Sequence, residues 1–189
     1  MNENKKQLIK LLEKGTTQQE AFAFYDKLEP VDVEKMVGKW KGKELPSGHP
    51  MDGVLTLFPW YGKQFIDKET VHPLVFKERS GKKFLVNPDQ VFKYYIKVMK
   101  SKILKKMINN RNVNPHKYDW ILKCFRTKYS KARLRQIEYR GKVSTAMIYD
   151  NVPIIDVFRK LDNNTVIGVM DVKGSFDDLG YFFILKKVN

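Results

Sequence analysis

The chain has 189 residues and a formal charge of +15, from 36 Lys and Arg against 21 Asp and Glu. Its 42% hydrophobic content is enough to bury a sizeable core, which excludes wholesale disorder and a collagen-like fibre. No apolar run reaches the roughly 20 residues of a membrane-spanning helix, and the first residues lack the apolar core of a signal peptide. We therefore expect a cytoplasmic protein, with residues 1–189 as a single compact unit. The single Cys124 permits neither an internal disulfide nor a multi-cysteine zinc site.

The chain begins with helical patterns and continues into strand patterns. Residues 5–28 predict one or two short helices, with Thr17 and Glu20 spaced as a capping box. Residues 32–36 predict one further helical turn, and residues 39–43 a short strand. After a loop rich in Pro and Gly, the patterns predict a buried element at 51–60 and strands at 71–77 and 83–86.

The middle of the chain carries most of the positive charge. Sixteen Lys or Arg and two acidic residues lie between Lys93 and Lys142. Apolar residues recur at helical spacing over 91–108 with lysines between them, which predicts a basic amphipathic helix. In one interpretation, the apolar stripe of this helix packs on its own domain. In the other, the helix binds an anionic surface, either lipid or nucleic acid. The lysines of that alternative are Lys93, Lys97, Lys100, Lys105 and Lys106.

The last third of the chain is a series of strand-length blocks separated by Gly, Pro, Asn and Asp. These blocks are residues 132–140, 142–149, 153–161, 165–172 and 181–188. Their spacing predicts an antiparallel meander or barrel. We divide the unit into residues 20–88, a Lys-rich helical connection at 89–128, and the antiparallel strands at 129–189.

The pentapeptide Gly38-Lys39-Trp40-Lys41-Gly42 resembles the bacterial GXWXG-motif family, whose members usually continue into a companion C-terminal domain of unknown function. Further blocks similar to the family lie at residues 48–53, 60–65, 71–74, 132–135, 139–141, 146–150, 153–156 and 168–171. The resemblance brings no established activity. The Lys-rich middle matches no block of the family.

The Gly-X-Trp after a short helix also resembles the first strand of lipocalins and related ligand-binding barrels, in which the Trp plugs the closed end. Together with the helix and strand patterns, this resemblance predicts an α+β fold with an antiparallel, barrel-like (calycin/lipocalin-like) sheet, N-terminal helices and one basic amphipathic helix. It also implies that a basic residue of the last strand, Lys186 or Lys187, packs over Trp40.

Two carboxylates in apolar strands are candidate catalytic residues. A two-residue turn at 163–164 would place Asp156 directly opposite Asp171. Two carboxylates directly opposite each other on neighbouring strands repel unless they share a proton, a cation or an Arg. Arg140 is the candidate counter-ion. The alternatives are an Asp-Arg-Asp acid/base site and a buried structural ion network.

Several other residues are candidate ligand-binding residues. His49 and Asp52 share a loop, and with His72 they could converge on one mouth. Their spacing is not that of a helical zinc motif, so we predict no metal site. No glycine-rich nucleotide loop occurs, so we predict no cofactor.

A second group of candidates lies near an aromatic block. Lys63 follows Trp60 and Tyr61, so it could bind an anionic ligand head beside an aromatic wall. The simpler interpretation makes Trp60 a core residue and Lys63 solvated. Tyr149 and Asp150 complete the candidates.

The sequence favours binding of a small apolar or amphipathic molecule in an aromatic pocket. One alternative is a hydrolase or isomerase that uses the Asp-Arg-Asp constellation, and another is a binder of anionic surfaces through the Lys-rich helix. The sequence leaves open whether the protein is an enzyme and which oligomer it forms.

Overall fold

The computed structural model describes residues 3–99, 114, 116, 119–174 and 178–188. Its helices are α1 (Glu3–Lys14), α2 (Gln18–Lys27), α3 (Val33–Met36), α4 (Pro88–Met99) and α6 (Asp119–Cys124). Its strands are β1 (Gly38–Glu44), β2 (Trp60–Phe65), β3 (Val71–Lys77), β4 (Lys83–Leu85), β5 (Ala132–Tyr139), β6 (Lys142–Tyr149), β7 (Ile154–Asp162), β8 (Thr165–Val172) and β9 (Tyr181–Val188). Within the described residues, no helix is both long and apolar enough to cross a lipid bilayer.

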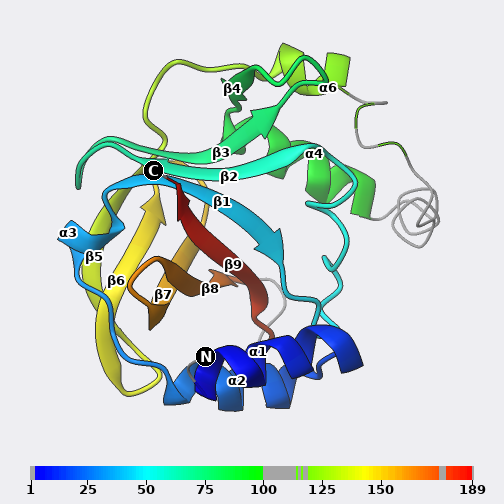
Figure 1. Ribbon diagram of the computed structural model, residues 1–189. Coiled ribbons are helices and arrows are strands. Elements are labelled where there is room, and N and C mark those ends of the chain that lie inside the picture. Colours follow the sequence, from blue (N-terminus) through cyan, green and yellow to red (C-terminus); the bar gives the residue numbers. More distant parts are fainter. Residues whose placement is uncertain (1–2, 100–113, 115, 117–118, 175–177, 189) are drawn as a thin grey trace.

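The strands form one antiparallel sheet that closes on itself (Figure 1). The order is β2-β1-β9-β8-β7-β6-β5-β3-β4, and β2 also pairs with β3. Eight strands therefore make a ring, and β4 lies outside it, paired only with β3. The expected antiparallel α+β architecture is confirmed. The ring joins strands from both ends of the chain, because β1 pairs with β9 and β3 pairs with β5.

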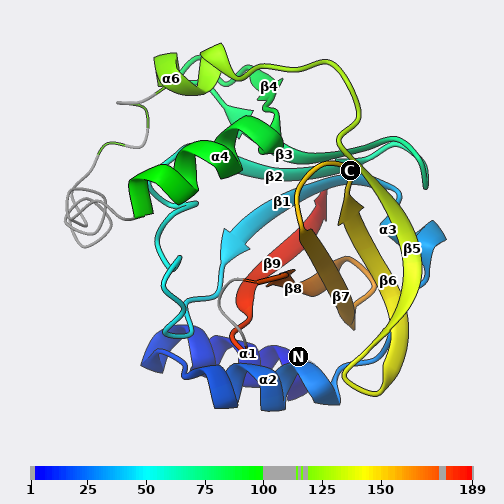
Figure 2. The same cartoon turned by 180° about the vertical axis from the view of Figure 1, so that it is seen from behind.

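The N-terminal helices cover the outer face of part of the ring. Both views show α1 and α2 together on one side of the sheet (Figures 1 and 2). Leu8, Phe24 and Leu28 of this region belong to the same buried cluster as Val169 and Phe182 of the sheet. The predicted capping box is present, since the Thr17 side chain accepts from the Glu20 N–H and the Glu20 carboxylate accepts from the Thr17 N–H. Burial of the apolar helix face and this cap together explain the helix position.

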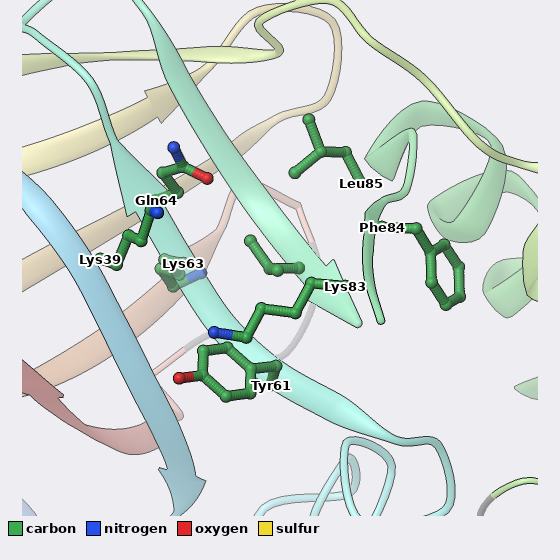
Figure 3. A pocket seen from close by; sticks show the side chains of 8 residues that line it. Lys39, Tyr61, Lys63, Gln64, Lys83, Phe84 and Leu85 are labelled. Atoms are coloured by element: carbon green, nitrogen blue, oxygen red, sulfur yellow. The ribbon is translucent and has the colours of Figure 1, made fainter. Parts of the chain in front are cut away.

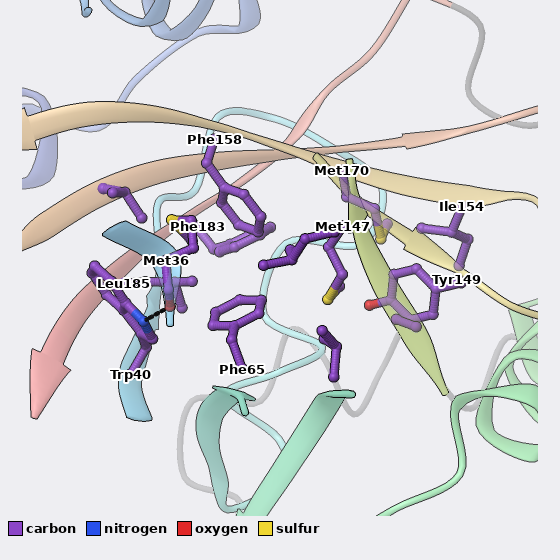
Figure 4. Packing of buried hydrophobic residues seen from close by; sticks show 14 of the residues in the cluster. Met36, Trp40, Phe65, Met147, Tyr149, Ile154, Phe158, Met170, Phe183 and Leu185 are labelled. Carbon is purple, nitrogen blue, oxygen red and sulfur yellow. Dashed lines mark hydrogen bonds between the residues drawn. The ribbon is translucent and has the colours of Figure 1, made fainter. Parts of the chain in front are cut away.

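The inside of the ring holds a second buried cluster (Figure 4). Trp40 and Leu185 lie at one end, Tyr149 and Met170 lie at the other, and phenylalanine rings fill the space between. Trp40 is 2% exposed, and its indole N–H donates to the Met36 carbonyl at 2.7 Å. This end of the ring is therefore closed by packed side chains.

A basic residue of the last strand packs over Trp40. The Lys187 Nζ lies 5.4 Å from the centre of the Trp40 ring and donates to the Lys35 carbonyl at 3.1 Å. Strands β1 and β9 place Trp40 and Lys187 opposite each other in register. The expectation that Lys186 or Lys187 occupies this place is confirmed for Lys187.

The predicted pairing of Asp156 with Asp171 is wrong. The turn at 163–164 forms as expected, with Asp162 opposite Thr165. A register shift then follows between Lys160 and Asp162, and it moves the remaining pairs by one residue. Asp156 therefore faces Met170, and Asp171 faces Ile155. Because side chains alternate along a strand, this bulge places the two carboxylates on opposite faces of the sheet.

The segments between the predicted helices and strands differ from expectation in two places. Residues 50–59 form a series of turns instead of one buried element, and the next strand, β2, begins at Trp60. The predicted basic helix is confirmed as α4 as far as Met99. The rest of the expected helix, residues 100–108, lies outside the described residues. The short helix α6 was not predicted.

Candidate functional site

Lys63 and Asp156 form a buried ion pair inside the ring. The distance from Lys63 Nζ to Asp156 Oδ2 is 2.8 Å, and the two side chains are 4% and 1% exposed. Strands β2 and β7, which carry them, lie on opposite sides of the ring, four steps apart in either direction. The ion pair therefore crosses the interior of the sheet instead of joining neighbouring strands.

An irregularity in β2 turns both Trp60 and Lys63 toward the interior. Residues three apart in a regular strand point to opposite faces. The pairing of β2 with β3 shifts register on both sides of Gly62, whose φ is +148°. A Cβ on Gly62 would lie 1.9 Å from the Trp40 carbonyl oxygen, so this close approach of two strands requires glycine.

Tyr149 completes the polar cluster. Its hydroxyl lies 3.4 Å from Asp156 Oδ2 and 3.5 Å from Lys63 Nζ. Lys63 also donates to the Pro73 carbonyl at 3.3 Å, and its Nζ lies 4.9 Å from the centre of the Phe183 ring. The ammonium is thus held by a carboxylate, a carbonyl and the negative face of an aromatic ring.

Burial changes the proton affinities of this cluster. It raises the pKa of Asp156 above its usual value, and the Lys63 ammonium opposes that shift. Burial, together with the nearby Asp156 carboxylate, also raises the pKa of the Tyr149 hydroxyl well above its usual value. Tyr149 is therefore a neutral hydrogen-bond donor at physiological pH.

The cluster forms part of the wall of a cavity of about 100 Å³. The other wall residues come from the ring interior, the 51–55 segment and helix α4: Met51, Val54, Leu55, Trp60, Leu74, Pro88, Val91, Phe92, Ile154, Met170, Tyr181 and Phe183. Two buried polar atoms of this wall, Asp156 Oδ1 and Trp60 Nε1, have no hydrogen-bond partner among the described residues. Buried polar groups are nearly always paired, so these two atoms suit a ligand or a bound water.

Glu44, at the end of β1, holds the segment that borders the cavity. It is 6% exposed, and its carboxylate accepts from the Gly53 and Leu55 backbone N–H groups at 3.2 and 2.7 Å. It also accepts from the hydroxyls of Thr56 and Tyr181. These bonds fix residues 53–56 against β9, which positions Leu55 in the cavity wall.

His49 and Asp52 stabilise the same loop. The Asp52 Oδ2 accepts from three successive backbone N–H groups, those of residues 47–49, at 2.7 to 2.9 Å. His49 Nδ1 accepts from the Met51 N–H at 3.0 Å, and the imidazole lies 5.5 Å from the Tyr181 ring. Burial lowers the pKa of His49 to about 4. These two residues shape the border of the cavity.

His72 does not join His49 and Asp52 at a common mouth. It lies on β3 opposite Gln64, and its imidazole interacts with the backbone of Tyr129. Among the described residues, no group of three or more His, Cys, Asp and Glu side chains could hold a metal ion. The expected convergence of these three side chains is therefore absent.

Tyr61 does not line the cavity of the polar cluster, and it lies at a separate hollow that Lys63 also borders. It lines a hollow of about 230 Å³ together with Lys39, Gln64 and Lys83 (Figure 3). The Lys83 Nζ lies 3.8 Å from the centre of the Tyr61 ring. Of Trp60 and Tyr61, which were predicted as one aromatic wall, only Trp60 lines the cavity of the polar cluster.

The proposed Asp-Arg-Asp constellation is not formed. Arg140 lies in the turn after β5 with a φ of 51°, and its guanidinium donates twice to the Asp26 carboxylate, at 2.7 Å each. Asp171 lies on the outer face of β8, opposite Ile155. Asp150, a candidate ligand-binding residue, is exposed and pairs with Arg133 at 3.7 Å. The catalytic role predicted for Arg140 with Asp156 and Asp171 is therefore wrong.

The structure leaves the anionic-surface prediction untested. Lys93 is exposed on α4. Lys97 lies in the same helix, in a part where side chains are not described. The remaining residues of that prediction, Lys100, Lys105 and Lys106, lie outside the described residues.

Comparisons with known proteins match two separate segments of the chain. Residues 23–81 match the model of the GXWXG protein family, and residues 130–187 match a domain of unknown function, DUF4334. These matches bear out the resemblance to the GXWXG family, each over about a third of the chain. As the resemblance implied, its family segment is followed by the companion domain, and neither match includes the Lys-rich middle.

One solved structure is similar over its whole length. It is the crystal structure of a protein from Thermomonospora curvata, with 29% sequence identity, a TM-score of 0.68 and complete coverage of both chains. No functionally curated protein matches this sequence. The similarity to this solved structure supports the fold alone.

Sequence reasoning singled out Lys63, Asp156 and Tyr149 but did not bring them together. It assigned Lys63 to a ligand anion and Asp156 to a second carboxylate. It missed Glu44 and Tyr181 entirely, although a carboxylate at the end of a strand followed by a Gly- and Pro-rich loop is a usable signal for a loop anchor. Strand closure places Lys63, Asp156, Tyr149 and Tyr181 around one cavity. Glu44 holds the loop that borders it.

Proposed function

We propose that the protein binds a small, electrically neutral molecule with an apolar body and one hydroxyl or carbonyl group. The observation that carries this proposal is the cavity wall itself. It is mostly aromatic and aliphatic, and it contains a paired Lys63 and Asp156 beside two buried polar atoms without partners. Ligand sites commonly combine an apolar lining with a few converging polar groups in this way.

The charge balance of the wall argues for a neutral ligand. Lys63 and Asp156 already neutralise each other at 2.8 Å. A carboxylate or an ammonium entering the cavity would bring an unpaired charge into an apolar environment, which costs several kcal/mol. An anionic head on Lys63, the interpretation drawn from the sequence, is therefore less favourable than a neutral one.

The unpaired atoms define the polar head of the ligand. Asp156 Oδ1 can accept a hydrogen bond, and Trp60 Nε1 can donate one. A hydroxyl group can satisfy both atoms, and a carbonyl group can satisfy Trp60. The remainder of the ligand would contact side chains such as Leu55, Phe92 and Met170.

The size and position of the cavity favour a compact ligand. Its volume of about 100 Å³ is smaller than the roughly 300 to 1,000 Å³ of most drug-sized sites. The packed Trp40 end and the ring of eight strands support a calycin/lipocalin-like assignment, in which the ligand enters at the end opposite the plug. Helix α4 and residues 51–55 border the cavity here.

Native mass spectrometry of freshly purified protein, followed by extraction, tests for a retained molecule. Titration with three matched probes then tests the charge argument: cyclohexanol, cyclohexylamine and cyclohexanecarboxylate. We expect cyclohexanol to bind at least about tenfold more tightly than either charged probe. A hydrogen bond to a charged group contributes about 1.5–3 kcal/mol, and a charged probe loses this gain because it must also be desolvated. Tighter binding of the carboxylate would overturn the neutral-ligand proposal.

A matched pair of variants locates the binding site. Lys63→Gln combined with Asp156→Asn keeps the wall neutral but removes both charges, and it should weaken cyclohexanol binding. Asp171→Asn changes a carboxylate on the other face of the sheet, and it should leave binding unchanged. Equal affinities of the two variants would place the binding site elsewhere.

A further inference from the structure

We infer that this cavity also transfers protons: Asp156 acts as a base on the carbon next to the carbonyl group of a bound neutral ketone, while Trp60 hydrogen-bonds the carbonyl oxygen. This inference rests on the proposed ligand binding. It assigns an activity, carbon-acid proton exchange or isomerisation, and a substrate class, carbonyl compounds with an adjacent C–H group.

The two oxygens of Asp156 have different tasks. Oδ2 is held by Lys63 at 2.8 Å and by the Tyr149 hydroxyl at 3.4 Å, which fixes the orientation of the carboxylate. Oδ1 is buried and has no partner among the described residues. An oriented carboxylate with one unsolvated oxygen is a better proton acceptor than a hydrated one, and burial raises the pKa of Asp156 in the same direction.

Trp60 and Lys63 favour negative charge on the carbonyl oxygen. The Trp60 indole N–H is a buried donor without a partner, and Lys63 Nζ lies 5.9 Å from the centre of that ring. Donors that are already oriented in an apolar cavity stabilise a developing oxyanion strongly. The same cavity therefore contains a base and an N–H donor, the two functions that enolate formation needs.

The step balances within these groups and the bound ketone. The C–H bond breaks, the proton moves to Asp156 Oδ1, and the electron pair forms the C=C bond of an enolate whose oxygen accepts from Trp60. Return of the proton to the same carbon restores the ketone, and return to a more distant carbon of an unsaturated ketone gives an isomer. No electron transfer and no cofactor are involved.

Deuterium uptake by cyclohexanone in D₂O tests the inference, with mass spectrometry of the recovered ketone as the readout. We expect the wild-type protein to accelerate uptake above buffer. Asp156→Asn should lower the protein-dependent rate by about 100-fold, the contribution typical of a general base. Trp60→Phe should lower it by about 100-fold, the effect typical of removing one oxyanion donor. Asp171→Asn is the matched control and should exchange at the wild-type rate.

A second measurement separates folding and binding from proton transfer. Thermal unfolding and saturation-transfer NMR with cyclohexanone are recorded for each variant. If Asp156→Asn fails to fold, Lys63→Gln with Asp156→Asn replaces it, because that double variant leaves no buried charge unpaired. Binding without protein-dependent exchange overturns the proton-transfer inference and leaves the proposed binding function intact. Absence of both cyclohexanone binding and a retained ligand overturns the binding proposal and the proton-transfer inference together. Exchange that persists in every folded variant overturns the inference, because it assigns the proton transfer to another site.

Discussion

Lys63 and Asp156 connect opposite sides of the strand ring through one buried ion pair of 2.8 Å. Lys63 lies in the segment that matches the GXWXG model, and Asp156 lies in the segment that matches the companion domain. The ion pair therefore bridges the two family segments at the wall of the cavity.

Removing one partner of this ion pair should be much more harmful than removing both. Asp156→Asn or Lys63→Gln alone leaves a buried charge without compensation, and each should lower the free energy of unfolding by about 3–5 kcal/mol. The double variant should recover most of that loss, and urea unfolding measures all three. Additive losses in the double variant would contradict the role of the pair as a coupled unit.

The second glycine of the family motif should be needed for the cavity wall. A Cβ on Gly42 would lie 2.2 Å from the Trp60 ring, so Gly42→Ala should displace that ring and lower stability by about 1–3 kcal/mol. Binding of cyclohexanol should weaken at the same time. Lys41→Ala, on the exposed neighbouring residue, is the control for both measurements. Unchanged cyclohexanol binding in Gly42→Ala would mean that Trp60 is not part of the binding site.

Stability should fall in mild acid because of His49. Its pKa is lowered by burial from 6.5 to about 4, so below pH 6.5 the unfolded chain takes up a proton that the folded protein does not bind. The free energy of unfolding should therefore decrease as the pH falls from about 6.5 to 4, by up to about 3 kcal/mol from this group. Unfolding measured across this range should show a smaller pH dependence in His49→Asn. An identical pH profile in that variant would refute the assignment.

Trp40 and Lys187 should contribute very unequally to the closed end of the ring. Trp40→Ala removes a side chain that is 2% exposed and should cost about 3–5 kcal/mol. Lys187→Met keeps the aliphatic contact but removes the cation, which should cost about 1 kcal/mol or less. Thermal or urea unfolding distinguishes the two. Comparable losses would mean that the lysine closes this end together with the indole.

Much of the local structure follows from local chemistry. The Thr17 and Glu20 capping box, the turn at 163–164 and the alternating patterns of 132–188 predict the second helix and the last five strands closely. Hydrogen bonds within a few residues and the two-residue period of a strand determine these features, so they can be recognised in one sequence.

The candidate site depends on two departures from regular pairing. The register shift around Gly62 turns Lys63 inward with Trp60, and the shift before Asp162 turns Asp156 inward and away from Asp171. Counting residue pairs from the turn assumes that the two strands pair regularly. One extra residue in a strand reverses the face of every side chain beyond it.

The sequence by itself determined the resemblance to the GXWXG family, the antiparallel α+β class, every strand except β2 and the candidate residues, because motifs, periodicity and turns act over short stretches of chain. The tertiary structure alone decided which candidates meet. Strand closure brings Lys63 and Asp156, 93 positions apart, to the two sides of one cavity, and it leaves Arg140 with Asp26 on the outside. Bulges and ring closure depend on contacts between distant strands, and no local pattern contains that information.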